Sequence, residues 1–227
     1  YFSADDGNTG DELWAHNTSN QSTWQVADIN SGPNPSSVWD YKEILVGDTI
    51  YFSADDGNTG IELWAHDTSN HSTWLAADVN NGPVGSGPGY YMEISVGDTI
   101  YFSAAGESTG VELWAHDTSN HSTWLAADVN SGSGHGSPGD SMAMLVGDTI
   151  YFAASDGNTG TELWAHDTSN HSTWQLADVR SGVYSSNPGE YMYMLVGDTV
   201  IFDSNDGSTG TELWALDISI NHVIIYD

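Results

Sequence analysis

Residues 51–80 read YFSADDGNTGIELWAHDTSNHSTWLAADVN, and this pattern returns at Tyr101 with 25 of its 30 positions unchanged. Further copies begin at the same spacing, at Tyr1, Tyr151 and Ile201. The period is therefore 50 residues, and four full copies are followed by a fifth of 27 residues. A fixed period of this length is typical of architectures in which one supersecondary unit is repeated.

Each repeat contains four short segments with the composition of β-strands. Residues 91–96 and 99–103 flank Gly97-Asp98, a two-residue hairpin signal. Two more strands are expected in a repeat, at 62–67 and 72–79 in the second copy, joined by a polar turn. No segment has the periodicity of a helix. The pattern predicts an all-β, five-bladed β-propeller built from 50-residue, four-stranded repeats, with the two Trp of each repeat filling the space between blades.

The predicted blades form one domain over residues 1–227, and their bounds are 1–30, 40–80, 90–130, 140–180 and 190–227. The sequence starts inside the second strand of its first blade, so the inner strand of that blade is expected from residues upstream, from another subunit or not at all. Residues 221–227 are expected to be the fourth strand of the last blade, because a short link reverses the chain into an antiparallel neighbour. An unpaired edge in the first blade would invite strand addition and self-association.

The charge balance is extreme, with 32 Asp and Glu against 2 Lys and Arg, for a formal net charge of -30. Such a chain repels phosphate backbones, which excludes nucleic acid as a partner. No apolar run is long enough for a membrane span, no signal peptide is visible at Tyr1, and a mature soluble chain is expected. The absence of Cys removes disulfides, thiolate nucleophiles and Cys-based zinc sites.

This acidity predicts a protein whose stability rises with salt, as in a marine or halophilic setting. Salt screens the self-repulsion of the carboxylates over distances of about 8 Å or less. Thermal melting in low and high salt should therefore give a higher Tm in high salt, and added Ca²⁺ should act in the same direction. An unchanged Tm would contradict this explanation of the charge.

The string Glu-Leu-Trp-Ala-His-Asp-Thr occurs at 62–68, 112–118 and 162–168, followed each time by Trp and then by Ala-Asp-Val. It resembles the Glu-Leu-Trp-x-x-Asp-Gly-Thr repeat family and, more loosely, kelch blades. The resemblance covers essentially the whole chain and implies a β-propeller of secreted or surface proteins from marine microbes, archaea among them. Here Thr-Ser-Asn at 68–70 stands in the turn in place of Gly-Thr. The family implies little about chemistry, because propellers host binding, scaffolding and catalysis alike.

Two sets of acidic residues are candidate Ca²⁺ ligands. The first is a ring of turn aspartates expected near a central channel, namely Asp48, Asp98, Asp148 and Asp198. The alternative is that each Asp simply favours its Gly-Asp turn. The second set is a loop cluster such as Asp55-Asp56-Gly57-Asn58 with Glu62, which lacks EF-hand spacing and is broken in the third copy at 105–108.

Two recurring polar residue types have both a functional and a structural interpretation. Asn-x-Ser sequons in the turns are candidate glycosylation sites if the chain is secreted, and they start at Asn17, Asn20, Asn70, Asn120 and Asn170. Alternatively, Asn and Ser are there as good turn residues. The repeated histidines, His66, His116 and His166, with His71, His121 and His171, are interpreted as structural, because a residue repeated on every blade does not converge on one metal centre.

The variable connections between blades are the predicted binding face. Their aromatic and acidic residues are the candidate ligand-binding residues Trp39, Asp40, Tyr90, Asp140, Tyr184 and Glu190. The predicted function is a non-catalytic extracellular or cell-surface binding or adhesion propeller for a glycan, a peptide or another surface component. One alternative is a structural subunit of a surface layer or filament, assembled by strand addition. A second is a hydrolase or lyase using loop acids such as Asp40, Asp140 and Glu190, although no Gly-x-Ser-x-Gly elbow is present.

Overall fold

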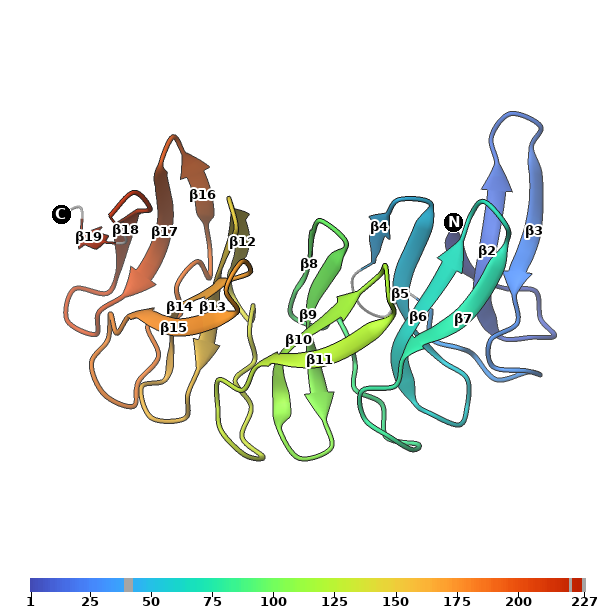
Figure 1. The fold of residues 1–227 in the computed structure, drawn as a ribbon, viewed down its shortest axis with the longest axis horizontal. Coiled ribbons are helices and arrows are strands. Elements are labelled where there is room, and N and C mark those ends of the chain that lie inside the picture. Colours follow the sequence, from blue (N-terminus) through green and yellow to red (C-terminus); the bar gives the residue numbers. More distant parts are fainter. Residues whose placement is uncertain (39–42, 221, 226–227) are drawn as a thin grey trace. The chain divides into compact units, whose positions relative to one another are not determined.

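A computed structural model describes residues 1–38, 43–220 and 222–225 of the chain. The described residues form five antiparallel sheets, one per repeat, which we call blades 1 to 5 (Figure 1). Blade 1 has three strands, β1 (Phe2–Asp5), β2 (Asp11–Asn17) and β3 (Ser22–Ala27). Blade 2 has four, β4 (Ile44–Val46), β5 (Thr49–Asp55), β6 (Ile61–Asp67) and β7 (Ser72–Ala77).

The other three blades repeat the four-stranded pattern of blade 2 in chain order. Blade 3 consists of β8 (Glu93–Val96), β9 (Thr99–Gly106), β10 (Gly110–Asp117) and β11 (Ser122–Ala127). Blade 4 consists of β12 (Ala143–Val146), β13 (Thr149–Ser155), β14 (Thr161–Asp167) and β15 (Ser172–Ala177). Blade 5 consists of β16 (Tyr193–Val196), β17 (Thr199–Asn205), β18 (Thr211–Asp217) and β19 (His222–Ile225).

The chain divides into two compact units, and the division passes through blade 3. Unit 1 contains Tyr1–Ser108 and Trp114–Trp124, and unit 2 contains Thr109–Leu113 and Leu125–Asp227. Each unit is described by itself below. In the part of the chain that the structure describes, no helix is long and apolar enough to cross a bilayer.

The turns follow from the residues that occupy them. In blade 2, Val46 pairs with Thr49 across Gly47-Asp48, and Gly47 has a φ of 60°. A positive φ at the first central residue only is the geometry of a type II′ hairpin turn, which favours Gly there. The next hairpin turn ends at His71, whose φ is 62° and whose N–H donates to the Asp67 carbonyl at 2.8 Å. The Thr68 N–H donates to the Asp48 carbonyl at 2.8 Å, which places these two turns side by side as expected.

Neighbouring blades bury an apolar layer between them within each unit. In unit 1 the layer joins blade 2 to blade 3, and its members include Leu63, Ala65, Ala77, Ile100, Phe102 and Ala104. In unit 2 the same positions recur between blades 4 and 5, where Leu163 and Ala165 pack with Val200 and Phe202. Tryptophans of both blades complete each layer, Trp74 and Trp114 in unit 1 and Trp174 and Trp214 in unit 2. The prediction that the paired tryptophans pack between blades is confirmed at these two interfaces.

The first and last blades differ from the middle ones in exposure. Strand β1 pairs with β2 alone among the described residues, as predicted for a blade without an inner strand. Strand β19 pairs antiparallel with β18, which confirms the assignment of the C-terminal segment to the fourth position. Phe2 is 37% exposed whereas Phe52 is fully buried, and Leu213 is 41% exposed whereas Leu163 is fully buried. Within its own unit, each end blade therefore has one face without the apolar layer that covers the middle blades.

Candidate functional site

The variable connections leave the fourth strand of one blade and enter the first strand of the next, and we call them crossover loops. They comprise residues 28–43, 78–92, 128–142 and 178–192. The loop between the second and third strands of each blade, for example 56–60, is called the BC loop. The Ser86 carbonyl accepts a hydrogen bond from Ala105 N–H at 2.8 Å, and Gly87 N–H donates to the Ile61 carbonyl at 3.1 Å. Each crossover loop thus lies beside BC loops, as predicted from strand connectivity.

A buried carboxylate anchors each crossover loop described in the middle of the chain. Glu62 is fully buried on β6 and accepts Val79 N–H at 3.0 Å, Ser86 N–H at 2.7 Å and the Ser86 hydroxyl at 2.6 Å. Burial raises the pKa of Glu62 to about 7, although these hydrogen bonds act in the opposite direction. The carboxylate therefore joins the start and the middle of the loop to the sheet.

The same anchor recurs in the other copies. Glu112 accepts Val129 N–H at 2.7 Å and Gly136 N–H at 2.7 Å, and burial raises its pKa to about 7. Glu162 accepts Val179 N–H at 2.8 Å and the Ser186 hydroxyl at 2.7 Å. Sequence reasoning placed Glu62 in a Ca²⁺-like cluster and missed this role. The available signal was a Glu directly before Leu-Trp at the same strand position of every copy.

The anchored loops present the predicted ligand-binding residues in different settings. Tyr90 is 58% exposed and makes an edge contact with Tyr91, with ring centroids 4.6 Å apart. Tyr184 is 63% exposed, and the Arg180 guanidinium carbon lies 5.0 Å from its ring centroid. Trp39 and Asp40 lie outside the described residues.

Two of the predicted loop acids are brought close enough to interact. Burial and, secondarily, the charge of Glu190 raise the pKa of Asp140. Their loops are joined by the Ser141 hydroxyl, which donates to the Pro188 carbonyl at 2.9 Å. The structure thus places Asp140 and Glu190 together in unit 2, while Tyr90 belongs to unit 1.

The turn aspartates are exposed, and the main-chain carbonyls of three of them accept hydrogen bonds from the neighbouring turn. The carbonyls of Asp48, Asp98 and Asp148 accept N–H and hydroxyl hydrogen bonds from Thr68, Thr118 and Thr168. Among the described residues, no three His, Asp or Glu side chains lie close enough together to hold a metal ion. The proposed ring of Asp48, Asp98, Asp148 and Asp198 spans both units and stays a prediction.

The BC loops close on themselves instead of forming the expected cluster with the strand glutamate. Asp56 Oδ1 accepts hydrogen bonds from Asn58 N–H at 2.9 Å, Thr59 N–H at 2.8 Å and the Thr59 hydroxyl at 2.9 Å. Burial acts to raise the pKa of Asp56, but these hydrogen bonds together lower it. Because Glu62 is turned into the core, the grouping of Asp56 with Glu62 is not formed.

The histidines and sequon asparagines take part in local structure. His66 and His116 are fully buried, and each Nδ1 lies 2.8 to 2.9 Å from the hydroxyl of a threonine on the next strand, Thr73 or Thr123. This supports the structural interpretation of these histidines. The sequon residue Asn70 is exposed, and its Nδ2 donates to Asp67 Oδ2 at 2.7 Å. Glycosylation at Asn17, Asn20, Asn70, Asn120 and Asn170 stays a prediction.

The buried acids and histidines predict opposite effects of acidification on stability. Glu62 and Glu112, with pKa values of about 7 when folded against 4.5 ordinarily, bind more protons in the folded state, so their contribution rises as the pH falls from 7. Burial lowers the pKa of His116 and His166 to about 4 from 6.5, so their contribution is lost as the pH falls below 6.5. In high salt, the Tm of the wild type minus that of E62Q/E112Q should rise as the pH is lowered from 7.5 to 5. A difference independent of pH would contradict the raised pKa values.

Comparison with known proteins gives a likeness of fold alone. No protein-family model matches the chain, and no curated protein sequence matches it. The structure resembles that of TolB from Acinetobacter baumannii, with a TM-score of 0.52 and 13% identity over 97% of this chain and 49% of TolB. It also resembles a puromycin hydrolase S511A mutant, with a TM-score of 0.57 and 12% identity over 89% of this chain and 30% of the hydrolase. A prolyl endopeptidase matches with a TM-score of 0.55 and 12% identity, over 96% of this chain and 30% of the peptidase.

The chain thus spans about half of TolB and under a third of the two hydrolases. These proteins contain β-propellers, and the five antiparallel sheets of this chain correspond to propeller blades. The resemblance to the Glu-Leu-Trp repeat family stays a prediction. The fold predicted from the repeat is confirmed: the chain is an all-β propeller of five blades.

Proposed function

We propose that the protein is a non-catalytic binding propeller at the cell surface or outside the cell. In this proposal it recognises a glycan, a peptide or another surface component through its crossover loops. The observation that carries the proposal is the contrast within each repeat. The strands are buried between blades, whereas the crossover loops hold the sequence variation and the exposed side chains of Tyr90 and Tyr184.

The buried glutamates support this proposal because they hold the loops in place. A loop tied at its start and its middle to a fully buried carboxylate loses less conformational entropy when it binds a partner. Exposed aromatic side chains on such a platform supply contact area with few rotatable bonds. The face is therefore suited to recognition, and its acidity favours neutral or cationic partners.

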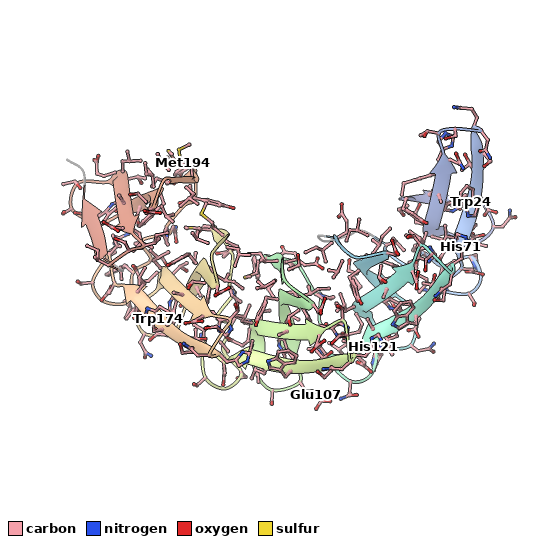
Figure 2. All side chains as sticks on the ribbon, turned by 45° about the horizontal axis from the view of Figure 1, so that its top comes forward. Trp24, His71, Glu107, His121, Trp174 and Met194 are labelled. Atoms are coloured by element: carbon pink, nitrogen blue, oxygen red, sulfur yellow. The ribbon has the colours of Figure 1, made fainter. Side chains whose placement is uncertain are left out.

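The test is binding of the full chain to glycan and peptide arrays, comparing the wild type with Y90A/Y184A. We expect the double variant to bind at least about tenfold more weakly, since exposed aromatic anchors are typical binding hot spots. Trp24→Ala is the matched control, because Trp24 is 41% exposed on β3, outside the crossover loops (Figure 2). Equal loss in both variants, or binding unaffected by Y90A/Y184A, would contradict recognition through the exposed aromatic side chains of the crossover loops.

A structural subunit assembled by strand addition is a second candidate, favoured by the edge of β1. A cavity of about 580 Å³ lies beside this edge and is lined by Tyr1, Phe2, Ile44, Leu45 and Ile50, among others. In blade 2 the corresponding edge of β5 is occupied by β4. A synthetic peptide of residues 91–98 should bind beside β1 and reduce any self-association seen by light scattering. A chain that is monomeric and does not bind the peptide would exclude this candidate.

A further inference from the structure

Two polar pockets occupy corresponding positions in the repeat, one in each unit. The first, of about 400 Å³, lies between blades 1 and 2 and is lined by Asn30, Ser31, Asp56, Asn58 and Trp64, among others. The second, of about 440 Å³, lies between blades 3 and 4 and is lined by the equivalent residues Asn130, Ser131, Asp156, Asn158 and Trp164. Both volumes fall within the range of about 300 to 1,000 Å³ for small-molecule sites.

The pocket walls consist mainly of polar side chains whose orientation is fixed by hydrogen bonds. Asn30 is only 9% exposed, and its Nδ2 donates to the Pro35 carbonyl at 3.0 Å, so its orientation is held. Its Oδ1 accepts no hydrogen bond from the described residues. Asp56 Oδ1 accepts three hydrogen bonds within its own loop, and in the second pocket Asp156 Oδ2 also accepts Asn158 Nδ2 at 3.4 Å. The indole N–H groups of Trp64 and Trp164 are buried without an acceptor among the residues that the structure describes, as are those of Trp14 and Trp114 outside the pockets.

The lining selects a class of ligand. Amide, hydroxyl and carboxylate groups next to a Trp ring match a molecule with several hydroxyls and one apolar face, as a pyranose has. A single cation is disfavoured, because the described residues form no cluster of three charged or imidazole ligands. Anionic sugars are disfavoured by Asp56 and Asp156 and by the formal net charge of -30.

We infer that these two pockets are subsites for a neutral sugar residue, an assignment that rests on the proposed binding function and narrows its ligand class. Each subsite is built from one crossover loop and from the BC loop of the following blade. Side-chain oxygens of Asn and Asp accept hydrogen bonds from the sugar hydroxyls. The Trp ring packs against the apolar face of the sugar. The expected affinity for a single small sugar is weak, on the order of 1 mM.

The chain contains its own blocked version of the pocket between blades 4 and 5. Arg180 stands there in place of Asn30, with its Nε 2.7 Å from where a Cβ on Gly207 would lie. Its Nη1 lies 3.4 Å from the carbonyl oxygen of Ser185. Asn30 Nδ2 donates to the carbonyl of Pro35, which is the equivalent residue of the first repeat. An Arg is therefore compatible with the fold at this position, where its side chain lies against Gly207 of the BC loop.

Between blades 2 and 3 the BC loop lacks the sugar-binding groups. Gly106 replaces Asp56 and Glu107 replaces Gly57, and Glu107 lies at the tip of its loop (Figure 2). Asn80 remains in place of Asn30 at this interface. The position of Asn80 therefore offers a control for the same substitution where the partner loop is different.

The experiment compares wild type, N30R/N130R and N80R by saturation-transfer difference NMR with methyl glycosides of glucose, galactose and mannose. We expect at least one glycoside to bind the wild type and N80R, and to bind N30R/N130R at least about tenfold more weakly. Thermal melting of all three proteins checks that the blocked variant is folded. A chelator should leave the binding unchanged, because no metal takes part.

Several results would overturn the assignment of the pockets. They are equal binding by N30R/N130R, loss of binding with the chelator, preference for galacturonic acid, and no binding of any neutral glycoside at tens of millimolar. These results would not by themselves overturn the proposed function. Array binding that is weakened by Y90A/Y184A but not by N30R/N130R would still support recognition by the crossover loops. Array binding that neither Y90A/Y184A nor N30R/N130R weakens would count against both the proposed function and the sugar subsites.

Discussion

Glu62→Ala should lower the free energy of unfolding by about 3 to 5 kcal/mol, the largest effect expected from a single polar substitution in this chain. The change removes the carboxylate that accepts Val79 N–H and leaves the N–H and the hydroxyl of the buried Ser86 without their acceptor. Each buried donor without a partner costs about 1 to 3 kcal/mol. The cavity left by the side chain adds to the loss. Urea unfolding followed by tryptophan fluorescence measures the change.

The matched control for this prediction is Glu212→Ala. Glu212 occupies the same motif position in the fifth copy but is exposed. The substitution should therefore change the free energy of unfolding by less than about 0.5 kcal/mol, as is usual for surface positions. E62Q, which keeps one acceptor oxygen, should lie between the two. Similar losses for E62A and E212A would show that the carboxylate does not anchor the loop.

Phe102→Ala is expected to cost about 3 to 5 kcal/mol, the usual range for removing a fully buried phenylalanine. Phe102 has no exposed surface and packs with Leu63 and Ala65 across the interface between blades 2 and 3. Its loss leaves a cavity between two sheets whose backbones are held by their own strand pairing, so the space cannot close easily. A lower urea midpoint with an unchanged m-value would report this directly.

Phe2 supplies the comparison, because it is the same residue of the repeat in blade 1 and is 37% exposed. Phe2→Ala should cost less than about 1 kcal/mol, since only part of the side chain leaves an apolar environment. If F2A destabilised the protein as much as F102A does, Phe2 would be buried in solution. The pair of variants therefore also tests whether the Phe2 side chain is partly exposed in solution.

Much of the fold follows from short-range features of the sequence. The 50-residue period gives the number of blades, and Gly-Asp pairs such as Gly97-Asp98 give the hairpins. The predicted strand at 72–79 ends at Ala77 in the structure, because the following residues turn away to meet Glu62. That deviation comes from a tertiary hydrogen bond, which no local pattern contains.

The candidate site was harder to predict than the fold. Tyr90 and Tyr184, which are exposed in the structure, could be predicted from the sequence because they lie in the loops that differ between copies of the repeat. The pocket residues were not, since Asn30 and Asp56 belong to different repeats and each is also a good turn residue. Arg180, one of only two basic residues, was an available signal of a site that differs from its copies.

The amino-acid sequence by itself determined the strands, their hairpins and the division into repeated blades, because strand pairing within a blade joins residues that are close along the chain. Only the tertiary structure decided the role of Glu62, which reaches 17 residues ahead to Val79 and 24 residues ahead to Ser86. It also decided that Asn30 and Asp56 share a pocket. The physical reason is that a buried carboxylate and a pocket wall depend on which segments surround them, whereas a hairpin depends on its own residues.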